Sequence, residues 1–225
     1  MDYVIATAVR VLVPLLMFRW PLAGVLLSML ADVSDFAFLN TQTPEAYAFY
    51  QTWDRAMDVW FYVVSVPMVM KWKDATSRSI AFAFLGYRMV GQVLFFFTQN
   101  RSFLFFFPNF YDNFLVIYLG YVSIFKRTRL LDSPLDALVI APLLLIPKII
   151  HEYFLHFLEL QPWERYDIAS LLGVAGTASY VVNIGFWSVL FYVLPFLAVF
   201  FYFRWKLRNS SGDWSSGHRA LRQTS

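Results

Sequence analysis

The chain has no cysteine among its 225 residues. This absence excludes disulfides, thiolate metal sites and cysteine nucleophiles. Charged side chains are also scarce at 15% of the residues, and none of the nine glycines belongs to a glycine-rich phosphate loop. A serine nucleophile elbow is lacking as well. The common sequence signatures of nucleotide-binding and acyl-transfer enzymes are therefore missing.

The chain is instead rich in apolar residues, with 59% hydrophobic and 20% aromatic side chains. A bilayer provides the solvent for so much apolar surface, and a helix needs about 20 residues to cross it. The segments do not show the alternating polarity of a membrane β-barrel. We therefore expect an all-α, polytopic bundle of about seven transmembrane helices (six to eight), at residues 3–18, 21–39, 46–70, 79–99, 103–125, 135–158 and 184–204.

The charges suggest an orientation and a tail. Basic residues concentrate in alternate loops and after Arg204, so the positive-inside rule puts the C-terminus in the cytoplasm. We expect one transmembrane domain over 1–204 and a basic, disordered cytoplasmic tail over 205–225. The net charge of +3 sits in short loops and this tail, which does not indicate a nucleic-acid partner. Residues 164–183 are too mixed in polarity to assign, and an interfacial or re-entrant helix is left open for them.

Two pairs of aspartates lie inside apolar segments. Asp32 and Asp35 are three residues apart and Asp54 and Asp58 are four apart, so each pair shares one helix face. A short loop joins the two helices and lets the pairs face each other. Four close carboxylates need a counter-charge, which a hard divalent cation such as Mg²⁺, Mn²⁺ or Ca²⁺ would supply. We assign all four aspartates as candidate metal ligands.

Two other interpretations of the aspartates remain open. Arg55, Arg88 or Lys148 could neutralise them in buried ion pairs that orient the helices. Alternatively, the carboxylates could conduct protons or ions, because ionisable groups inside a membrane often line such pathways.

A second polar group falls late in the sixth expected span. His151 and His156 are five residues apart, so they do not form the HExxH zinc motif, whose histidines are four apart. Glu152 shares a helix face with Lys148 and with His156. A histidine–carboxylate pair here could act as a general acid and base or complete a metal site, whereas the structural alternative is a Lys148–Glu152 ion pair.

The aspartate spacing resembles the opening of the CDP-alcohol phosphatidyltransferase family, whose motif reads DxxDG-xx-AR and then GxxxDxxxD. Asp32-Val33-Ser34-Asp35 and Asp54-Arg55-Ala56-Met57-Asp58 match its two halves, and the resemblance spans residues 10–58, about a fifth of the chain. It implies metal binding by these aspartates, with the last one, Asp58, as the base that activates an acceptor alcohol.

The chain departs from that motif at its small residues. Phe36 and Tyr50 stand where the family has glycines, and Leu39-Asn40 replaces its Ala-Arg pair. In the family these glycines let the nucleotide diphosphate approach the backbone. The family's site also opens to the cytoplasm, whereas the charge rule places these aspartates near the opposite face.

Together these features predict a metal-dependent membrane enzyme that acts on a phosphate-bearing lipid or polyprenyl substrate. We expect Asp58, His151 and Glu152 to be catalytic, and Arg88 and Lys148 to bind the phosphate. The alternatives are a transporter or proton-coupled carrier, and a non-catalytic structural subunit of a membrane complex. Membrane lipid is the expected partner, and association into a homo-oligomer is left open.

Overall fold

The computed structural model describes residues 3–39, 43–158 and 162–222. Every regular element within these ranges is helical and no strand occurs among them, which confirms the all-α prediction. Parts of two expected features, the loop at 40–46 and the tail at 205–225, lie outside the described residues.

The helices follow the apolar segments closely. The first half of the chain forms α1 (Tyr3–Leu12), a 3₁₀ helix η1 (Val13–Phe18), α2 (Pro21–Phe38), α3 (Pro44–Met70), α4 (Ala75–Thr98) and α5 (Ser102–Phe106). The second half forms α6 (Phe110–Phe125), α7 (Pro134–Glu152), a π-helical turn η2 (Tyr153–Phe157), α8 (Pro162–Arg165), α9 (Ile168–Leu171), α10 (Thr177–Ser188), a second π-helical turn η3 (Val189–Val193) and α11 (Leu194–Arg222).

Four helical stretches are long and apolar enough to cross a membrane: Ala75–Thr98, Ser102–Phe125, Pro134–Phe157 and Val181–Asn209. They coincide with the four expected spans at 79–99, 103–125, 135–158 and 184–204. The helices α2 and α3 carry the aspartates, and Tyr3–Phe18 is a shorter apolar helix. The count of seven spans stays a prediction.

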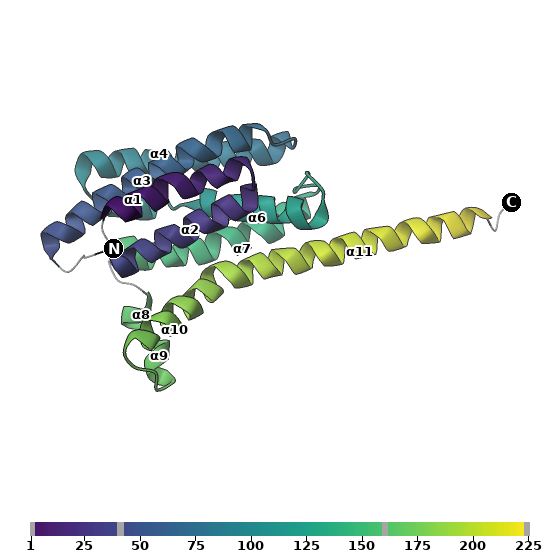
Figure 1. Cartoon of the computed structure of the whole chain (residues 1–225). Coiled ribbons are helices and arrows are strands. Elements are labelled where there is room, and N and C mark those ends of the chain that lie inside the picture. Colours follow the sequence, from purple (N-terminus) through teal and green to yellow (C-terminus); the bar gives the residue numbers. More distant parts are fainter. Residues whose placement is uncertain (1–2, 40–42, 159–161, 223–225) are drawn as a thin grey trace.

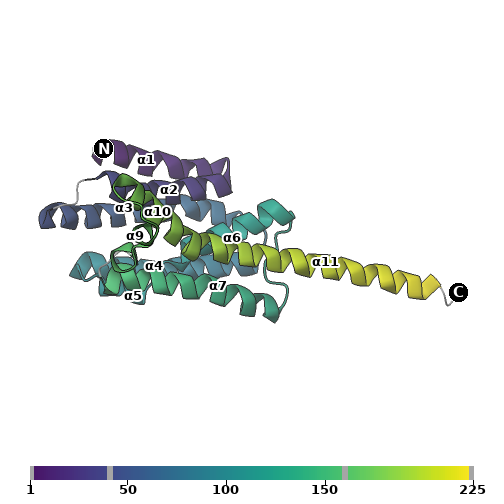
Figure 2. The ribbon, with the colours of Figure 1, turned by 90° about the horizontal axis from the view of Figure 1, so that it is seen from below.

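The helices α1 to α7 lie side by side as one bundle (Figure 1). The short helices α8, α9 and α10 gather beside one end of this bundle, and α11 extends past the other end. The view from below shows α11 running along the same direction as α6 and α7 (Figure 2).

Local sequence explains where several helices begin. The Thr43 side chain accepts a hydrogen bond from Ala46 N at 3.2 Å, and Asp74 caps α4 in the same way. Ser133 and Asp136 form a reciprocal capping box at the start of α7. Such caps satisfy the free backbone N–H groups of a first helical turn, which fixes the helix boundary.

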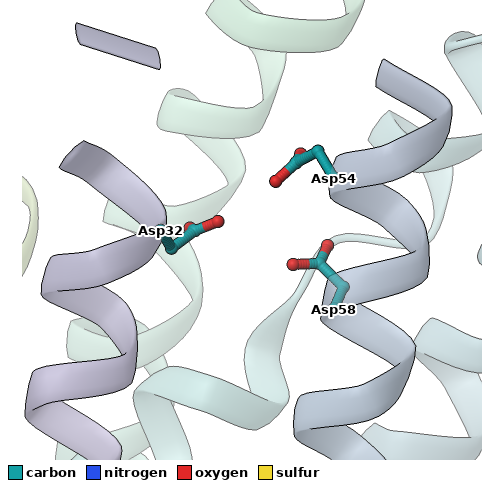
Figure 3. A group of neighbouring side chains, drawn as sticks. All are labelled: Asp32, Asp54 and Asp58. Carbon is teal, nitrogen blue, oxygen red and sulfur yellow. The ribbon is translucent and has the colours of Figure 1, made fainter. Parts of the chain in front are cut away.

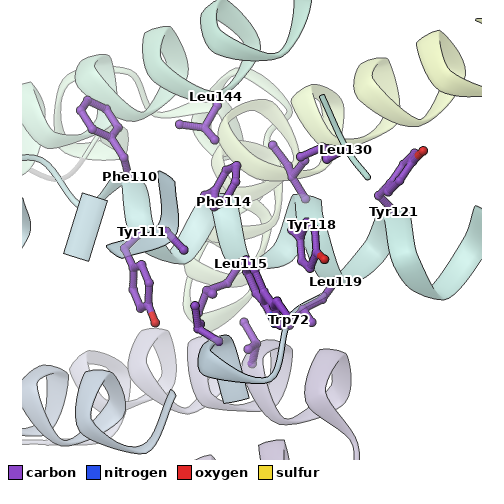
Figure 4. Packing of buried hydrophobic residues seen from close by; sticks show 14 of the residues in the cluster. Trp72, Phe110, Tyr111, Phe114, Leu115, Tyr118, Leu119, Tyr121, Leu130 and Leu144 are labelled. Atoms are coloured by element: carbon purple, nitrogen blue, oxygen red, sulfur yellow. The ribbon is translucent and has the colours of Figure 1, made fainter. Parts of the chain in front are cut away.

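The core is built around α6, which is the most buried of the four apolar stretches. Trp72 from the end of α3 stacks on Tyr118 with ring centroids 3.8 Å apart, and the Tyr111 hydroxyl lies 2.7 Å from the Ser65 hydroxyl (Figure 4). The aromatic side of α6 therefore joins α3 to the centre of the bundle. Other buried members of this cluster are Phe110, Phe114, Leu115, Leu119, Leu130 and Leu144.

The expected tail is partly structural. Lys206 lies 2.6 Å from the carboxylate of Asp136, which is fully buried, and Tyr202 donates a hydrogen bond to the same carboxylate at 2.7 Å. The structure thus ties the beginning of the 205–225 segment to α7, and α11 continues through Arg222. Sequence composition alone could not reveal this pairing, because Asp136 and Lys206 are far apart in the chain.

The helices η1 and α2 pack backbone against backbone at Gly24. A Cβ atom at this position would lie against the Met17 nitrogen and 2.8 Å from Met17 Cα. Small residues allow this kind of approach between membrane helices. The contact also fixes the position of η1, and with it α1, relative to α2.

We expect Gly24→Ala to lower the melting temperature in detergent and to cost about 1–3 kcal/mol of stability, because the methyl group meets rigid backbone. Gly86→Ala is the matched control, since a Cβ there meets no heavy atom within 4 Å. That substitution should be neutral or slightly stabilising in a helix. Equal melting temperatures for both variants would contradict the close packing of η1 on α2.

Candidate metal and polar site

Arg10 of α1 lies at the centre of all four aspartates. Its guanidinium forms an ion pair with Asp32, lies 2.9 Å from Asp35, 3.2 Å from Asp58 and 3.5 Å from Asp54. The arginine side chain is 5% exposed. A buried charge of this kind is stable only with close partners, so α1, α2 and α3 are held together by one group.

Two tryptophans of α3 hold α1 in the register that places Arg10. The indole of Trp53 donates a hydrogen bond to the Thr7 hydroxyl at 3.0 Å, and the indole of Trp60 donates to the Val11 carbonyl at 3.1 Å. The Arg10 guanidinium carbon also lies 5.9 Å from the centre of the Trp53 ring, within the range of a cation–π contact.

Arg55 supplies the second positive charge from α3 itself. It lies 2.8 Å from Asp54 and 2.9 Å from Asp58, and the Gln92 amide of α4 donates to Asp58 at 3.3 Å. Four carboxylates therefore face two guanidinium groups, counting Arg10. If all are ionised, two negative charges remain without a cationic partner, which equals the charge of one divalent metal ion.

Three of the carboxylates are close enough to share one ion. Asp32, Asp54 and Asp58 each offer an oxygen atom, and these atoms lie within 4.8 Å of one another. Their carboxyl groups point toward the same space between α2 and α3 (Figure 3). The Asp54 side chain is 7% exposed, and its Oδ1 atom is buried without a hydrogen-bond donor. An all-oxygen set of this kind suits Mg²⁺, Mn²⁺ or Ca²⁺.

A small cavity opens beside these aspartates. Arg10, Asp32 and Asp58 line it together with Asp112 from α6. Its volume of about 20 Å³ has room for one or two water-sized groups. The Asp32 side chain is 47% exposed, so the cavity is accessible at the side of the bundle where Asp32 lies. Remaining lining residues are Pro14, Ser28, Met29, Ala31 and Phe61.

A second polar cluster surrounds Glu152 of α7. Lys148 lies 2.9 Å from one carboxylate oxygen and His156 lies 2.9 Å from the other. The backbone N–H of Asn109 donates to Glu152 at 3.3 Å, and the Asn109 amide donates to Asp112 at 2.6 Å. Asn109 therefore connects the cavity beside the aspartates to the polar cluster on α7.

Two other predicted site residues, Arg88 and His151, contact groups other than the four aspartates. Arg88 donates to the backbone carbonyls of Leu104 and Phe107, at 3.3 and 2.9 Å, and its Nε atom is buried without an acceptor. His151 has its Nδ1 atom 3.3 Å from the Tyr192 hydroxyl rather than facing Glu152. Of the two residues assigned to phosphate, Lys148 is paired with Glu152, whereas Arg88 forms no ion pair among the described residues.

Of the three cations that the ion-pair interpretation offers as partners of the aspartates, Arg55 forms such pairs. Arg88 and Lys148 form no ion pair with the four aspartates among the described residues, and Arg10 takes that role. The sequence feature that could have pointed to this role is the position of Arg10 as a single arginine within the apolar segment 3–18. A charge in that setting must find a partner within the bundle.

No protein-family model matches the chain, and no characterised protein or solved structure shows significant similarity to it.

We expect Arg10→Met to cost about 3–5 kcal/mol of stability in metal-free detergent, because it leaves several close carboxylates without their shared counter-charge. Arg19→Met is the matched control, because Arg19 is exposed directly after η1. This substitution should change the free energy of unfolding by less than about 0.5 kcal/mol. Thermal unfolding measures both. An Arg10→Met variant as stable as the Arg19→Met variant would show that Arg10 does not hold the aspartates together.

Proposed function

We propose that this protein is a divalent-metal-dependent membrane enzyme acting on a phosphate-bearing lipid or polyprenyl substrate, with a bundle of about seven spans. The observation that carries the proposal is the group of Asp32, Asp54 and Asp58, whose oxygen atoms lie within 4.8 Å of one another. If all four aspartates are ionised, the two negative charges left without a cationic partner favour a divalent cation over a further ion pair.

In this proposal Asp32, Asp54 and Asp58 share the metal, Asp35 is a further candidate ligand, and Asp58 is also the candidate general base. A bound divalent cation would polarise a phosphoryl oxygen and neutralise its charge. Asp58 is positioned to take a proton from an acceptor hydroxyl, because it lines the cavity. This division of roles agrees with the family that the aspartate spacing resembles.

Metal binding and Arg10 compete for the same oxygens. Arg10 contacts Asp32 and Asp58, which are two of the three carboxylates that the ion would use, and lies 3.5 Å from the third. We propose that loading the site moves the Arg10 guanidinium away from this centre, while Arg55 keeps its own contacts with Asp54 and Asp58. Arg88, with its unpaired Nε donor, is the better candidate of the two cations for the substrate phosphate.

A proton-coupled carrier is the second candidate, and a specific observation favours it. Hydrogen bonds connect Asp112 through Asn109 to Glu152, whose second carboxylate oxygen faces His156. Asp112 lines the same cavity as Asp32 and Asp58. Titratable groups connected across a membrane bundle are typical of proton pathways.

Metal binding is tested by thermal unfolding with Mg²⁺, Mn²⁺ or Ca²⁺ at millimolar concentration. The ion should raise the melting temperature of the natural chain, and Asp54→Asn should abolish the rise because it removes a ligand. Asp132→Asn is the control, since Asp132 pairs only with surface Arg129 among the described residues and should leave the rise unchanged.

The same variants distinguish the enzyme from the carrier. Asp58→Asn should reduce turnover of a CDP-activated lipid or a polyprenyl phosphate by about 10²–10⁴-fold, the usual effect of losing a general base. A pH-driven flux in proteoliposomes that Glu152→Gln removes would favour the carrier instead. No thermal response to any of the three ions would exclude the metal site.

We propose further that the C-terminus is cytoplasmic and that the 40–46 loop faces the opposite side. Because the chain has no cysteine, a single Thr43→Cys can be labelled with a membrane-impermeant thiol reagent; Thr43 is exposed. Labelling of intact cells from outside is the expected result. Labelling only after permeabilisation would reverse the orientation and place the aspartates on the cytoplasmic side, as in the family they resemble.

A further inference from the structure

The turn between α9 and α10 exposes an unusually apolar surface. Leu171 is 82% exposed and Leu172 is 67% exposed. The six residues 171–176, Leu-Leu-Gly-Val-Ala-Gly, include no polar side chain. A turn in water normally carries Asn, Asp, Ser or other polar residues, so this composition is unlike an aqueous loop.

One side chain of α10 holds this turn in place. The Oδ1 atom of Asn183 accepts hydrogen bonds from the backbone N–H groups of Ile168 and Ala169, at 3.0 and 3.2 Å. Its amide donates to Asp167 at 2.8 Å, and this bond holds the pKa of the Asp167 carboxyl below its usual value. Asn183 is 4% exposed, and Ala169 is fully buried beneath it.

The turn also satisfies its own backbone donors. All seven N–H groups from residue 168 to residue 174 have an acceptor within the protein: Asn183 for 168 and 169, the Asp167 side chain for 170, and backbone carbonyls of residues 167–170 for 171–174. Surface loops usually leave several such groups to water. A segment that enters lipid has no water to pair with such groups, and each unpaired group there costs several kcal/mol.

The turn lies just before a stretch that is long and apolar enough to span a membrane. The apolar stretch that is long enough to span begins at Val181, and Asn183 belongs to it. Gly173 and Gly176 adopt positive φ angles of 71° and 68°, which reverse the chain just before that stretch. In Figure 1 the α8–α10 region lies beside the bundle, near one of its ends.

We propose that the turn formed by residues 166–174 inserts into the interfacial layer of the bilayer, with Leu171 and Leu172 among the acyl chains. Tyr166 is 52% exposed and packs edge-on against Phe154, and tyrosine is enriched at membrane interfaces. The partner is the lipid surface itself. The turn thereby anchors the start of the last span at a fixed depth. This inference does not depend on the proposed enzymatic activity.

The test uses the absence of cysteine. Leu171→Cys is labelled with an environment-sensitive fluorophore, and the full chain is reconstituted in phosphatidylcholine vesicles that contain spin-labelled lipids. The expected result is strong loss of fluorescence with a spin label near the headgroup, weaker loss with a label deep in the acyl chain, and little loss with aqueous iodide.

Two control positions calibrate the measurement. Val90→Cys, 48% exposed within the span Ala75–Thr98, should respond to the lipid labels and not to iodide. Lys73→Cys, in the exposed loop between α3 and α4, should respond to iodide alone. If the Leu171 probe behaves like Lys73, the turn lies in water. If neither quencher reaches it, a protein surface covers the turn. Either result overturns the proposal.

A second variant tests the role of Asn183. Replacing it by leucine in the Leu171→Cys background removes the acceptor for two backbone N–H groups, while it keeps a side chain of similar size. The preference for the headgroup label should then decrease, because the turn needs water for its freed donors. Unchanged quenching in this variant would show that the backbone pairing is not what lets the turn enter lipid.

Discussion

The contact of one buried arginine with four aspartates is the constraint on which much of this structure depends. Arg10 is the group through which α1, α2 and α3 meet, and few arrangements of these helices would satisfy it. The tryptophan hydrogen bonds from α3 to α1 and the close packing at Gly24 both fix the same helix in the position that the arginine requires. Electrostatics and packing therefore select one arrangement together.

This constraint connects stability with the proposed chemistry. The carboxylates that would bind a metal are the same ones that hold the three N-terminal helices together, so the site cannot be emptied of cations without weakening the fold. A divalent ion and the Arg10 guanidinium offer alternative ways to compensate the same charge. Such a site is suited to switch between two occupancies, since neither state leaves the aspartates without a counter-charge.

The helix α6 extends the influence of this site across the bundle. Asn109 caps its first turn and at the same time contacts Asp112 and Glu152. Polar groups on α2, α3, α6 and α7 thus meet around the buried start of one central helix, whose other faces are packed with aromatic residues. Burial among apolar side chains strengthens the interactions of these polar groups with one another.

The sequence by itself determined the helical architecture, four helices long and apolar enough to span a membrane, and the pairing of aspartates on two helix faces. These features depend on composition and on local periodicity, which a sequence displays directly. Only the tertiary structure decided that Arg10 is the shared counter-ion, that Lys148 belongs to Glu152, that His151 faces Tyr192, and that Lys206 is held by Asp136. Those contacts join side chains from different helices or select among neighbours on one helix, so they depend on how the helices rotate and pack, which no local pattern specifies.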